Sequence, residues 1–153
     1  MGNKNNTVGD TLIEDYMTAI TLTMNLKNSV LDIAKRMVAE NISSIAITDD
    51  KKEIIGILTE RDIVKIIANE VPPGGITAGS LMSSPPVAVR NNAPVEEAAK
   101  IMARKKVRHL LVEDSSGSNI MGIITVTDLA RYLRHKFETG EEVPASEVWK
   151  IFF

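Results

Sequence analysis

The chain matches itself when it is shifted by 65 residues, and this internal repeat restricts its possible folds more than any other feature. Met17 coincides with Met82, Val30 with Val95, Ala34 with Ala99, Met37 with Met102 and Asp49 with Asp114. One extra residue enters the polar segment 115–119, and the shift becomes 66, so that Gly56 corresponds to Gly122 and Asp62 to Asp128. Loops tolerate such insertions. The sequence therefore predicts two copies of one folding unit.

Both copies show the same order of expected elements: strand, helix, two strands and a second helix. In the first copy the ranges are Ile20–Thr23, Ser29–Glu40, Ser44–Thr48, Ile54–Leu58 and a helix from Thr59. In the second copy they are Val87–Arg90, Pro94–Lys105, His109–Glu113, Ile120–Ile124 and a helix from Thr125. The first copy has the apolar spacing of a helix at Val30, Ile33, Ala34, Met37 and Val38, and the apolar positions of its second helix include Ile63, Ile66 and Ile67. Asn28 is the expected N-cap, and Pro94 suits a first helical position.

The predicted fold class is α/β (α+β), with two pseudo-twofold-related repeats, each a small mixed β-sheet with two flanking helices. A unit of about 60 residues buries little surface alone, so we expect one joint core with a cleft on each side of the axis. The expected ranges are a flexible tail at 1–9, repeat 1 at 10–71, a Pro/Gly linker at 72–75, repeat 2 at 76–136, and a linker plus a short aromatic helix at 137–153.

Composition excludes several classes of function. The net charge of −2 does not provide the positive field of a nucleic-acid binder. The chain has no cysteine, and its two histidines, His109 and His135, lie far apart, so no metal-binding spacing exists. No phosphate-binding loop motif or nucleophile–base pairing supports an enzyme. No apolar run could span a membrane, and a cytoplasmic protein is the expectation.

Three motifs occur twice, in register. They are Met17-Thr18 and Met82-Ser83, Ile42-Ser43-Ser44 and Val107-Arg108-His109, and Gly-x-x-Thr-x-x-Asp at Gly56–Asp62 and Gly122–Asp128. With these motifs each copy resembles a CBS domain, and residues 10–135 resemble a tandem CBS pair, or Bateman module. The resemblance implies a non-catalytic regulatory module that binds an adenosine-containing ligand, namely AMP, ADP, ATP or S-adenosylmethionine. It also implies a homodimer and a regulated partner protein of unknown identity, with no required cofactor.

The resemblance also implies two sets of ligand-binding residues, each drawn from both repeats. Thr59 and Asp62 would share one site with Pro85, Val87, Val107, Arg108 and His109. Thr125 and Asp128 would share the other with Ile20, Leu22, Ile42, Ser43 and Ser44. The carboxylates would accept hydrogen bonds from the ribose hydroxyls, and the helix N-terminus would favour a phosphate. Because Arg108-His109 replaces the neutral Ser43-Ser44, the first site should bind phosphate more tightly.

Each of these features also has a purely structural interpretation. Thr-x-x-Asp at a helix start is close to a capping box. Arg104, Lys105 and Lys106 suit a solvated helix end, where cations offset the helix dipole. Met37 and Met102 lie on apolar helix stripes and are expected core residues. His135 is expected near a helix end without a special role.

Five of the six aromatic residues follow residue 131: Tyr132, Phe137, Trp149, Phe152 and Phe153. Ala145–Phe153 could form an amphipathic helix, which would either cover the core of this chain or contact a second copy or another protein. The alternative functions are a CBS-pair scaffold with empty clefts, S-adenosylmethionine binding, enzymatic catalysis, and nucleic-acid binding through Arg104–His109. The low aromatic content of residues 17–131 argues against base stacking.

Overall fold

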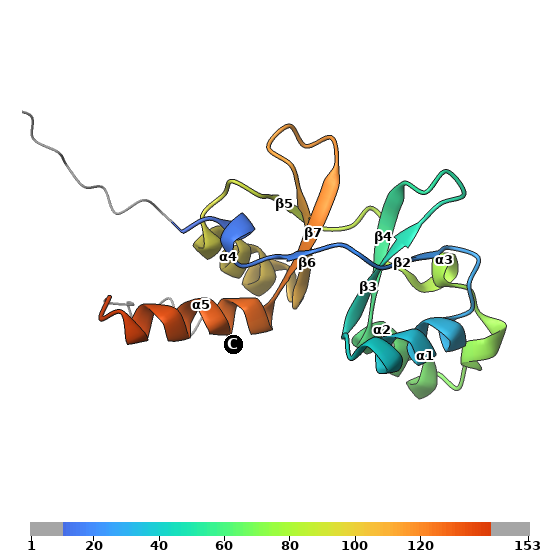
Figure 1. Ribbon diagram of the computed structural model, residues 1–153. Coiled ribbons are helices and arrows are strands. Elements are labelled where there is room, and N and C mark those ends of the chain that lie inside the picture. Colours follow the sequence, from blue (N-terminus) through green and yellow to red (C-terminus); the bar gives the residue numbers. More distant parts are fainter. Residues whose placement is uncertain (1–10, 142–153) are drawn as a thin grey trace, which may run out of the picture. The chain divides into compact units, whose positions relative to one another are not determined.

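The computed structural model describes residues 11–141, which form two compact units (Figure 1). One unit is residues 20–87, called unit A below. The other, unit B, combines residues 11–19 with the chain from residue 88 onward. The compact units therefore differ from the sequence repeats, because the opening segment of the chain belongs with the second half. The division of the sequence at residues 10, 71, 76 and 136 stays a prediction.

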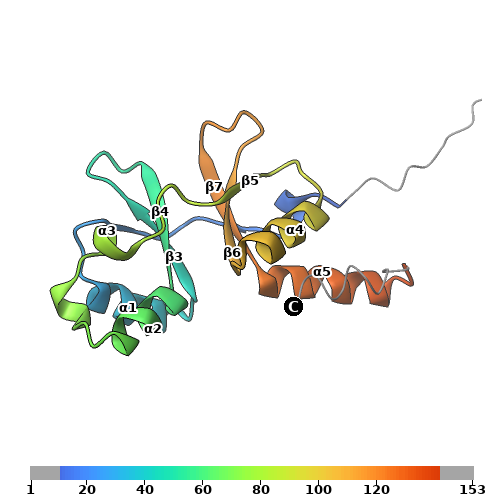
Figure 2. The same ribbon diagram turned by 180° about the vertical axis from the view of Figure 1, so that it is seen from behind.

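Unit A is a three-stranded sheet covered by helices. Its elements are β2 (Thr23–Asn25), α1 (Val30–Glu40), β3 (Ser44–Thr48), β4 (Ile54–Thr59), α2 (Glu60–Ala68), the 3₁₀ turn η2 (Pro73–Gly75) and α3 (Ala78–Leu81). The sheet order is β2-β3-β4, with β2 parallel and β4 antiparallel to β3. Both views show α1 and α2 side by side on one side of this sheet (Figures 1 and 2). The core contains Val30, Ile33, Met37, Ile45, Ile47, Leu58, Ile66 and Ala78.

Unit B repeats this arrangement with one added strand. Its elements are the 3₁₀ turn η1 (Ile13–Asp15), β1 (Thr18–Ala19), β5 (Ala88–Arg90), α4 (Val95–Lys105), β6 (His109–Glu113), β7 (Ile120–Thr125) and α5 (Val126–Glu138). The sheet order is β1-β7-β6-β5. The core contains Ile13, Val89, Val95, Ala98, Ala99, Met102, Leu110, Leu111, Val112, Ile124, Leu129, Tyr132 and Leu133. The small mixed sheets with flanking helices confirm the predicted fold class.

A pair of glycines lets the opening segment of each repeat pack against the sheet of the other repeat. Thr18 pairs with Ile123 beside Gly122, and Ser83 forms the equivalent bridge with Ile57 beside Gly56. A Cβ atom at Gly56 would lie 2.6 Å from Met82 Sδ and 2.9 Å from the carbonyl oxygen of Ser83. At Gly122 it would lie 2.7 Å from Met17 Sδ. The repeated Met and Gly residues of the sequence therefore contact each other: Met82 packs on Gly56, and Met17 packs on Gly122.

Some predicted boundaries and helix caps are wrong. The first strand does not occupy Ile20–Thr23; β2 begins at Thr23. Ser29, not Asn28, caps α1, because its hydroxyl accepts from the Asp32 N–H at 3.1 Å, whereas Asn28 Oδ1 accepts from the N–H of Asn25. Pro94 occupies the N-cap rather than the first helical position of α4.

Two side chains of the apolar helix stripes face outward. Val38 is 82% exposed and Ile67 is 56% exposed. The segment 72–75, expected to be a linker, includes η2, which packs on α1, and the chain continues into α3 within unit A.

Candidate functional site

The Thr-x-x-Asp motif of the first repeat forms the start of α2. Asp62 Oδ2 accepts from the main-chain N–H of Thr59 at 2.9 Å and from its hydroxyl at 3.1 Å. Thr59 has extended backbone angles and is the N-cap of the helix, so the capping-box interpretation is confirmed. Within the described part of the chain, the other carboxylate oxygen, Asp62 Oδ1, makes no hydrogen bond. A half-buried acceptor therefore remains at a helix N-terminus.

The second Thr-x-x-Asp motif has the same cap but a different environment. Asp128 Oδ2 accepts from the Thr125 N–H at 2.8 Å and from its hydroxyl at 3.2 Å, at the start of α5. Its other oxygen, Oδ1, accepts from Arg131 Nη2 at 3.2 Å. Asp128 is buried, with 6% of its surface exposed. Both oxygens of this carboxylate are thus hydrogen-bonded.

Arg131 is held beside Asp128 by the opening segment of the chain. Its Nη2 also donates to the carbonyl oxygen of Tyr16 at 2.8 Å, and its guanidinium carbon lies 5.6 Å from the centroid of the Tyr16 ring. The Tyr16 hydroxyl is hydrogen-bonded to His135 Nδ1 at 2.8 Å, and the ring packs edge-on against Tyr132. His135 therefore links the opening segment to the last turn of α5, which confirms its expected position near a helix end.

The buried face of α5 is fixed to α4 by a polar cluster. The Tyr132 hydroxyl donates to Glu96 Oε1, and Lys136 Nζ lies 3.7 Å from the same carboxylate and 5.0 Å from the Tyr132 ring centroid. Burial, together with the hydrogen bond to Glu96, raises the pKa of Tyr132 to about 12. The hydrogen bond with Tyr132 raises the pKa of Lys136. Tyr132 thus stays a protonated donor at neutral pH and holds the helix that carries Asp128 and Arg131.

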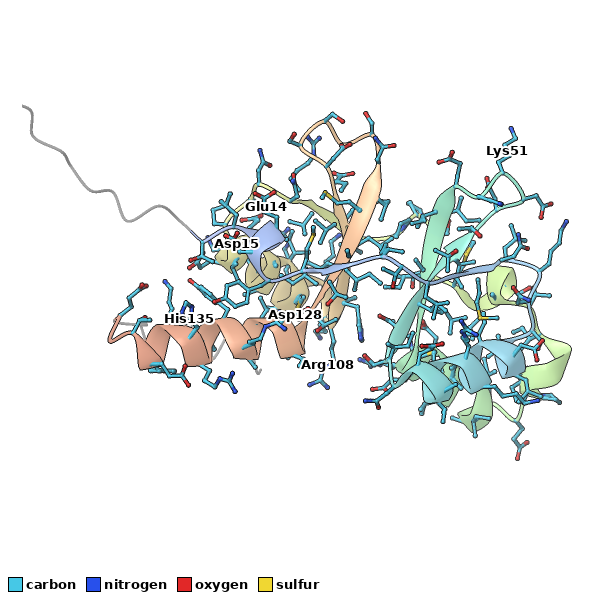
Figure 3. The ribbon with its side chains drawn as sticks, viewed as in Figure 1. Glu14, Asp15, Lys51, Arg108, Asp128 and His135 are labelled. Atoms are coloured by element: carbon cyan, nitrogen blue, oxygen red, sulfur yellow. The ribbon has the colours of Figure 1, made fainter. Side chains whose placement is uncertain are left out.

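The start of the central strand lies beside the Thr-x-x-Asp motif of its own repeat. In unit A, Ser44 is the register partner of Thr59, and the Glu60 N–H donates to the Ser43 carbonyl at 3.0 Å. In unit B, His109 pairs with Thr125 and the Val126 N–H donates to the carbonyl oxygen of Arg108 at 3.1 Å. Arg108 is exposed and lies at the same end of the unit as Asp128 (Figure 3).

The predicted site residues are divided between the two units. Unit A contains Ile20, Leu22, Ile42, Ser43, Ser44, Thr59, Asp62, Pro85 and Val87. Unit B contains Val107, Arg108, His109, Thr125 and Asp128. Pro85 and Val87 follow Ser83, which bridges to β4, so they share a unit with Asp62. The assignment of residues from both repeats to each site stays a prediction.

Other predicted residues have ordinary structural positions. Met37 and Met102 are each 5% exposed, which confirms them as core residues. Arg104, Lys105 and Lys106 are exposed at the end of α4, as expected. The proposed helix Ala145–Phe153 lies outside the described residues.

Sequence reasoning missed Arg131, which lies outside the positions of the recurring motifs. The available signal was its spacing: three residues after Asp128 on a helix, a side chain lies on the same face. Among residues 11–141, no group of three or more His, Cys, Asp or Glu side chains could hold a metal ion. Over the same residues, every helix is too short or too polar to cross a bilayer.

A protein-family model described as "CBS domain" matches residues 13–69 and 78–135. An uncharacterized protein of Methanopyrus kandleri is 35% identical over 115 residues, which are 74% of this chain and 58% of that protein. An L-aspartate semialdehyde sulfurtransferase of Methanosarcina acetivorans is 28% identical over 82% of this chain, but the match covers only 24% of that enzyme. The chain thus spans little more than half of the first relative and about a quarter of the second.

Solved structures share the fold. A CBS domain protein from Thermoplasma acidophilum superimposes with a TM-score of 0.78 at 23% identity, over 94% of this chain and 75% of that chain. The CBS domain pair of the protein MJ0100, in complex with 5′-methylthioadenosine and S-adenosyl-L-methionine, gives 0.74 at 25% identity, over 83% and 98%. CBSX2 in complex with AMP gives 0.66 at 25% identity, over 81% and 96%. The two family matches, in register with the internal repeat, show that this chain belongs to the CBS domain family and carries a tandem pair of CBS domains.

Proposed function

We propose that this chain is a non-catalytic regulatory module that binds an adenosine-containing ligand at its Thr-x-x-Asp motifs. The observation that carries the proposal is the carboxylate of Asp62. One of its oxygens caps α2, while the other accepts no hydrogen bond from the described residues. Such an oxygen can accept from a ribose hydroxyl, and the N–H groups at the start of the same helix favour an anionic group nearby.

Two related structures support the class of ligand. The MJ0100 pair holds 5′-methylthioadenosine and S-adenosyl-L-methionine, and CBSX2 holds AMP. The shared part of these ligands is adenosine, whose ribose carries the two adjacent hydroxyls that a carboxylate recognises. AMP, ADP and ATP are therefore the first ligands to test on this chain, followed by S-adenosylmethionine.

A regulatory role follows from the way such a ligand would act. A ligand that binds one arrangement of the two units better than another shifts the population toward that arrangement. A partner protein in the cytoplasm, or a larger chain of which this pair forms part, would respond to that shift. The sulfurtransferase relative is compatible with this role, because the match covers only a quarter of that enzyme. An interaction scaffold without ligand is the second candidate function.

Adenine nucleotides should stabilise the chain against heat. At a ligand concentration 100 times its dissociation constant, binding adds about 2.7 kcal/mol to the free energy of unfolding. For a chain of 153 residues this corresponds to a rise of roughly 5 to 10 °C in Tm. Melting curves with AMP, ADP, ATP and S-adenosylmethionine, with guanosine monophosphate as the base-exchanged control, provide the measurement. A melt that no adenosine compound moves at millimolar concentration would favour the scaffold.

The module is also proposed to pair with a second copy through α1 and α2 of unit A. Val38 on α1 and Val64 and Ile67 on α2 are 82%, 64% and 56% exposed. The same helices carry exposed charges of both signs, including Lys35 and Glu40 on α1 and Glu60 and Lys65 on α2. An apolar surface with a mixed charged rim can complement itself about a twofold axis.

Val38→Glu should therefore shift the chain toward monomer while leaving it folded, because the side chain is almost fully exposed. Sedimentation velocity at micromolar concentration measures the change. Phe137→Glu, at a 62% exposed position of unit B, makes the same change of charge and should leave the sedimentation coefficient unaltered. A wild-type chain that is already monomeric, or a dimer that survives Val38→Glu, would contradict this interface.

A further inference from the structure

We infer that Arg131 makes the Asp128 motif selective for adenosine ligands that carry a negative charge, whereas the Asp62 motif also accepts uncharged ones. The inference rests on the proposed function and assigns a ligand-specificity role to a residue outside the recurring motifs. The reason is that the second carboxylate oxygen has a hydrogen-bond donor in one motif and has none among the described residues in the other. Asp128 Oδ1 accepts from Arg131 Nη2 at 3.2 Å, while Asp62 Oδ1 accepts from no described residue.

The residue one helical turn after the aspartate differs between the two motifs, and so do its contacts. Under the shift of 66, Lys65 corresponds to Arg131, and both residues lie one helical turn after their aspartate. Lys65 is exposed and makes no ion pair within the described residues. Arg131, in contrast, has a second acceptor, the carbonyl oxygen of Tyr16 at 2.8 Å, and a ring on which its guanidinium packs. These contacts hold the guanidinium beside the carboxylate, and a planar guanidinium is well suited to packing on an aromatic ring.

Other contacts fix the position of Tyr16, and Tyr16 in turn holds Arg131 in its orientation toward Asp128. The Tyr16 hydroxyl is bonded to His135 Nδ1 at 2.8 Å, and the Tyr16 N–H donates to the carbonyl oxygen of Ile13 at 3.0 Å. Tyr132, which packs on the Tyr16 ring, is buried and bonded to Glu96. The carbonyl oxygen that holds Arg131 therefore belongs to an anchored turn.

The exposure of Arg131 leaves room for its contact with Asp128 to open. The Asp128 side chain is 8% exposed, but that of Arg131 is 53% exposed. A guanidinium with half of its surface in water can leave the carboxylate at small cost, because water and the Tyr16 carbonyl still satisfy its donors. The buried carboxylate, however, needs a new donor when Arg131 leaves. A ribose hydroxyl can supply that donor.

The charge of the ligand then decides whether the exchange is favourable. A neutral nucleoside replaces the ion pair between Arg131 and Asp128 with a hydrogen bond from an uncharged hydroxyl, and it offers the displaced Arg131 no anionic partner. A nucleotide replaces the same bond, and its phosphate accepts from the displaced guanidinium in a charge-assisted pair. The helix N-terminus favours the phosphate at both motifs, so it does not account for the difference between them. Arg131 accordingly changes partner, from the carboxylate to the phosphate, when a nucleotide binds.

The test is titration calorimetry with adenosine and AMP on the full chain, in a background of Asp62→Asn that reports on the Asp128 motif alone. Asparagine keeps an oxygen that can cap Thr59 but loses the carboxylate. In this background AMP should bind at least tenfold more tightly than adenosine. Arg131→Ala should strengthen adenosine binding about two- to fivefold, because the competing bond is gone, and weaken AMP binding about tenfold. The ratio of the two dissociation constants should thus fall by more than tenfold.

Controls separate this inference from the proposed function. Lys65→Ala in a background of Asp128→Asn should leave adenosine binding at the Asp62 motif unchanged, since Lys65 does not contact Asp62. Arg131→Lys should retain part of the preference for AMP, because it keeps the charge. A preference for AMP that Arg131→Ala leaves intact would overturn the inference while the proposed function stands. Failure of the wild-type chain to bind either ligand would overturn both, and binding at the Asp62 motif alone in every variant would overturn only the inference.

Discussion

Replacing Leu58 with alanine should lower the free energy of unfolding by about 2 to 5 kcal/mol, the usual range for a buried leucine. Leu58 lies in β4 of unit A with 0% of its surface exposed, among Ile45, Ile47 and Ile66 in the hydrophobic core. The substitution removes apolar contacts and leaves a cavity that the packed helices α1 and α2 cannot fully close. Urea denaturation should show a lower midpoint with an unchanged slope.

The equivalent residue of unit B is Ile124 in β7, which is also 0% exposed. Ile124→Ala should therefore cost a similar amount. Phe137→Ala is the control: Phe137 is 62% exposed and lies outside the proposed dimer interface, so its truncation should change the free energy of unfolding by no more than about 0.5 kcal/mol. Equal midpoints for Leu58→Ala and Phe137→Ala would show that the core is wrongly placed.

Gly56→Ala should destabilise the chain by about 1 to 3 kcal/mol, which is typical of overpacking in a close contact. The new Cβ would lie 2.9 Å from the carbonyl oxygen of Ser83, and main-chain atoms cannot move aside as a side chain can. Gly122→Ala should cost a similar amount, because its Cβ would lie 2.7 Å from Met17 Sδ and 3.0 Å from the carbonyl oxygen of Thr18. Both values come from urea denaturation, as above.

A control glycine and a second substitution make this test specific. A Cβ added at Gly75 would have no atom within 4 Å, so Gly75→Ala should not destabilise the chain. Met82→Ala should recover only part of the loss in Gly56→Ala, because the Ser83 carbonyl remains. A Gly56→Ala chain as stable as wild type would refute the packing of residues 82–83 against β4.

Internal repetition made most of the fold predictable. The same repeat also indicates the correct position of the first strand. The strand predicted at Ile20–Thr23 disagreed with its counterpart at Val87–Arg90, whereas β2 and β5 coincide under the shift of 65. Repetition could not predict the outward orientation of Val38 and Ile67. Helical spacing identifies an apolar stripe, but it does not set how much of the stripe one sheet can cover.

The sequence pattern also could not predict that residues 11–19 pack with the second half of the chain. Met17 and Met82 were visible as a repeated pair, and so were Gly56 and Gly122. Their periodicity is equally consistent with contacts inside one repeat and with contacts exchanged between repeats. The choice depends on tertiary packing, where a sulfur atom occupies the space left by a missing side chain.

For the candidate site, sequence identified the two carboxylates but not the difference between them. Thr59-x-x-Asp62 and Thr125-x-x-Asp128 predicted both helix caps correctly. The sequence-based asymmetry came from Arg108 and His109 against Ser43 and Ser44, and its effect on ligand binding stays a prediction. The structure adds Arg131, whose position depends on the carbonyl oxygen of Tyr16, a residue 115 positions away. The spacing between Asp128 and Arg131 is visible in the sequence, but the contact of Arg131 with Tyr16 joins distant positions and is not.

Ligand binding by this chain is proposed to depend on the two aspartates as acceptors, and calorimetric titration of AMP into the double variant Asp62→Asn, Asp128→Asn tests this most directly. Each asparagine keeps an oxygen for the helix cap, and the melting temperature without ligand shows that the double variant is folded. AMP binding should be abolished, or weakened at least 100-fold relative to the wild type, in the folded double variant. AMP binding of undiminished affinity in that variant would contradict the role of both carboxylates.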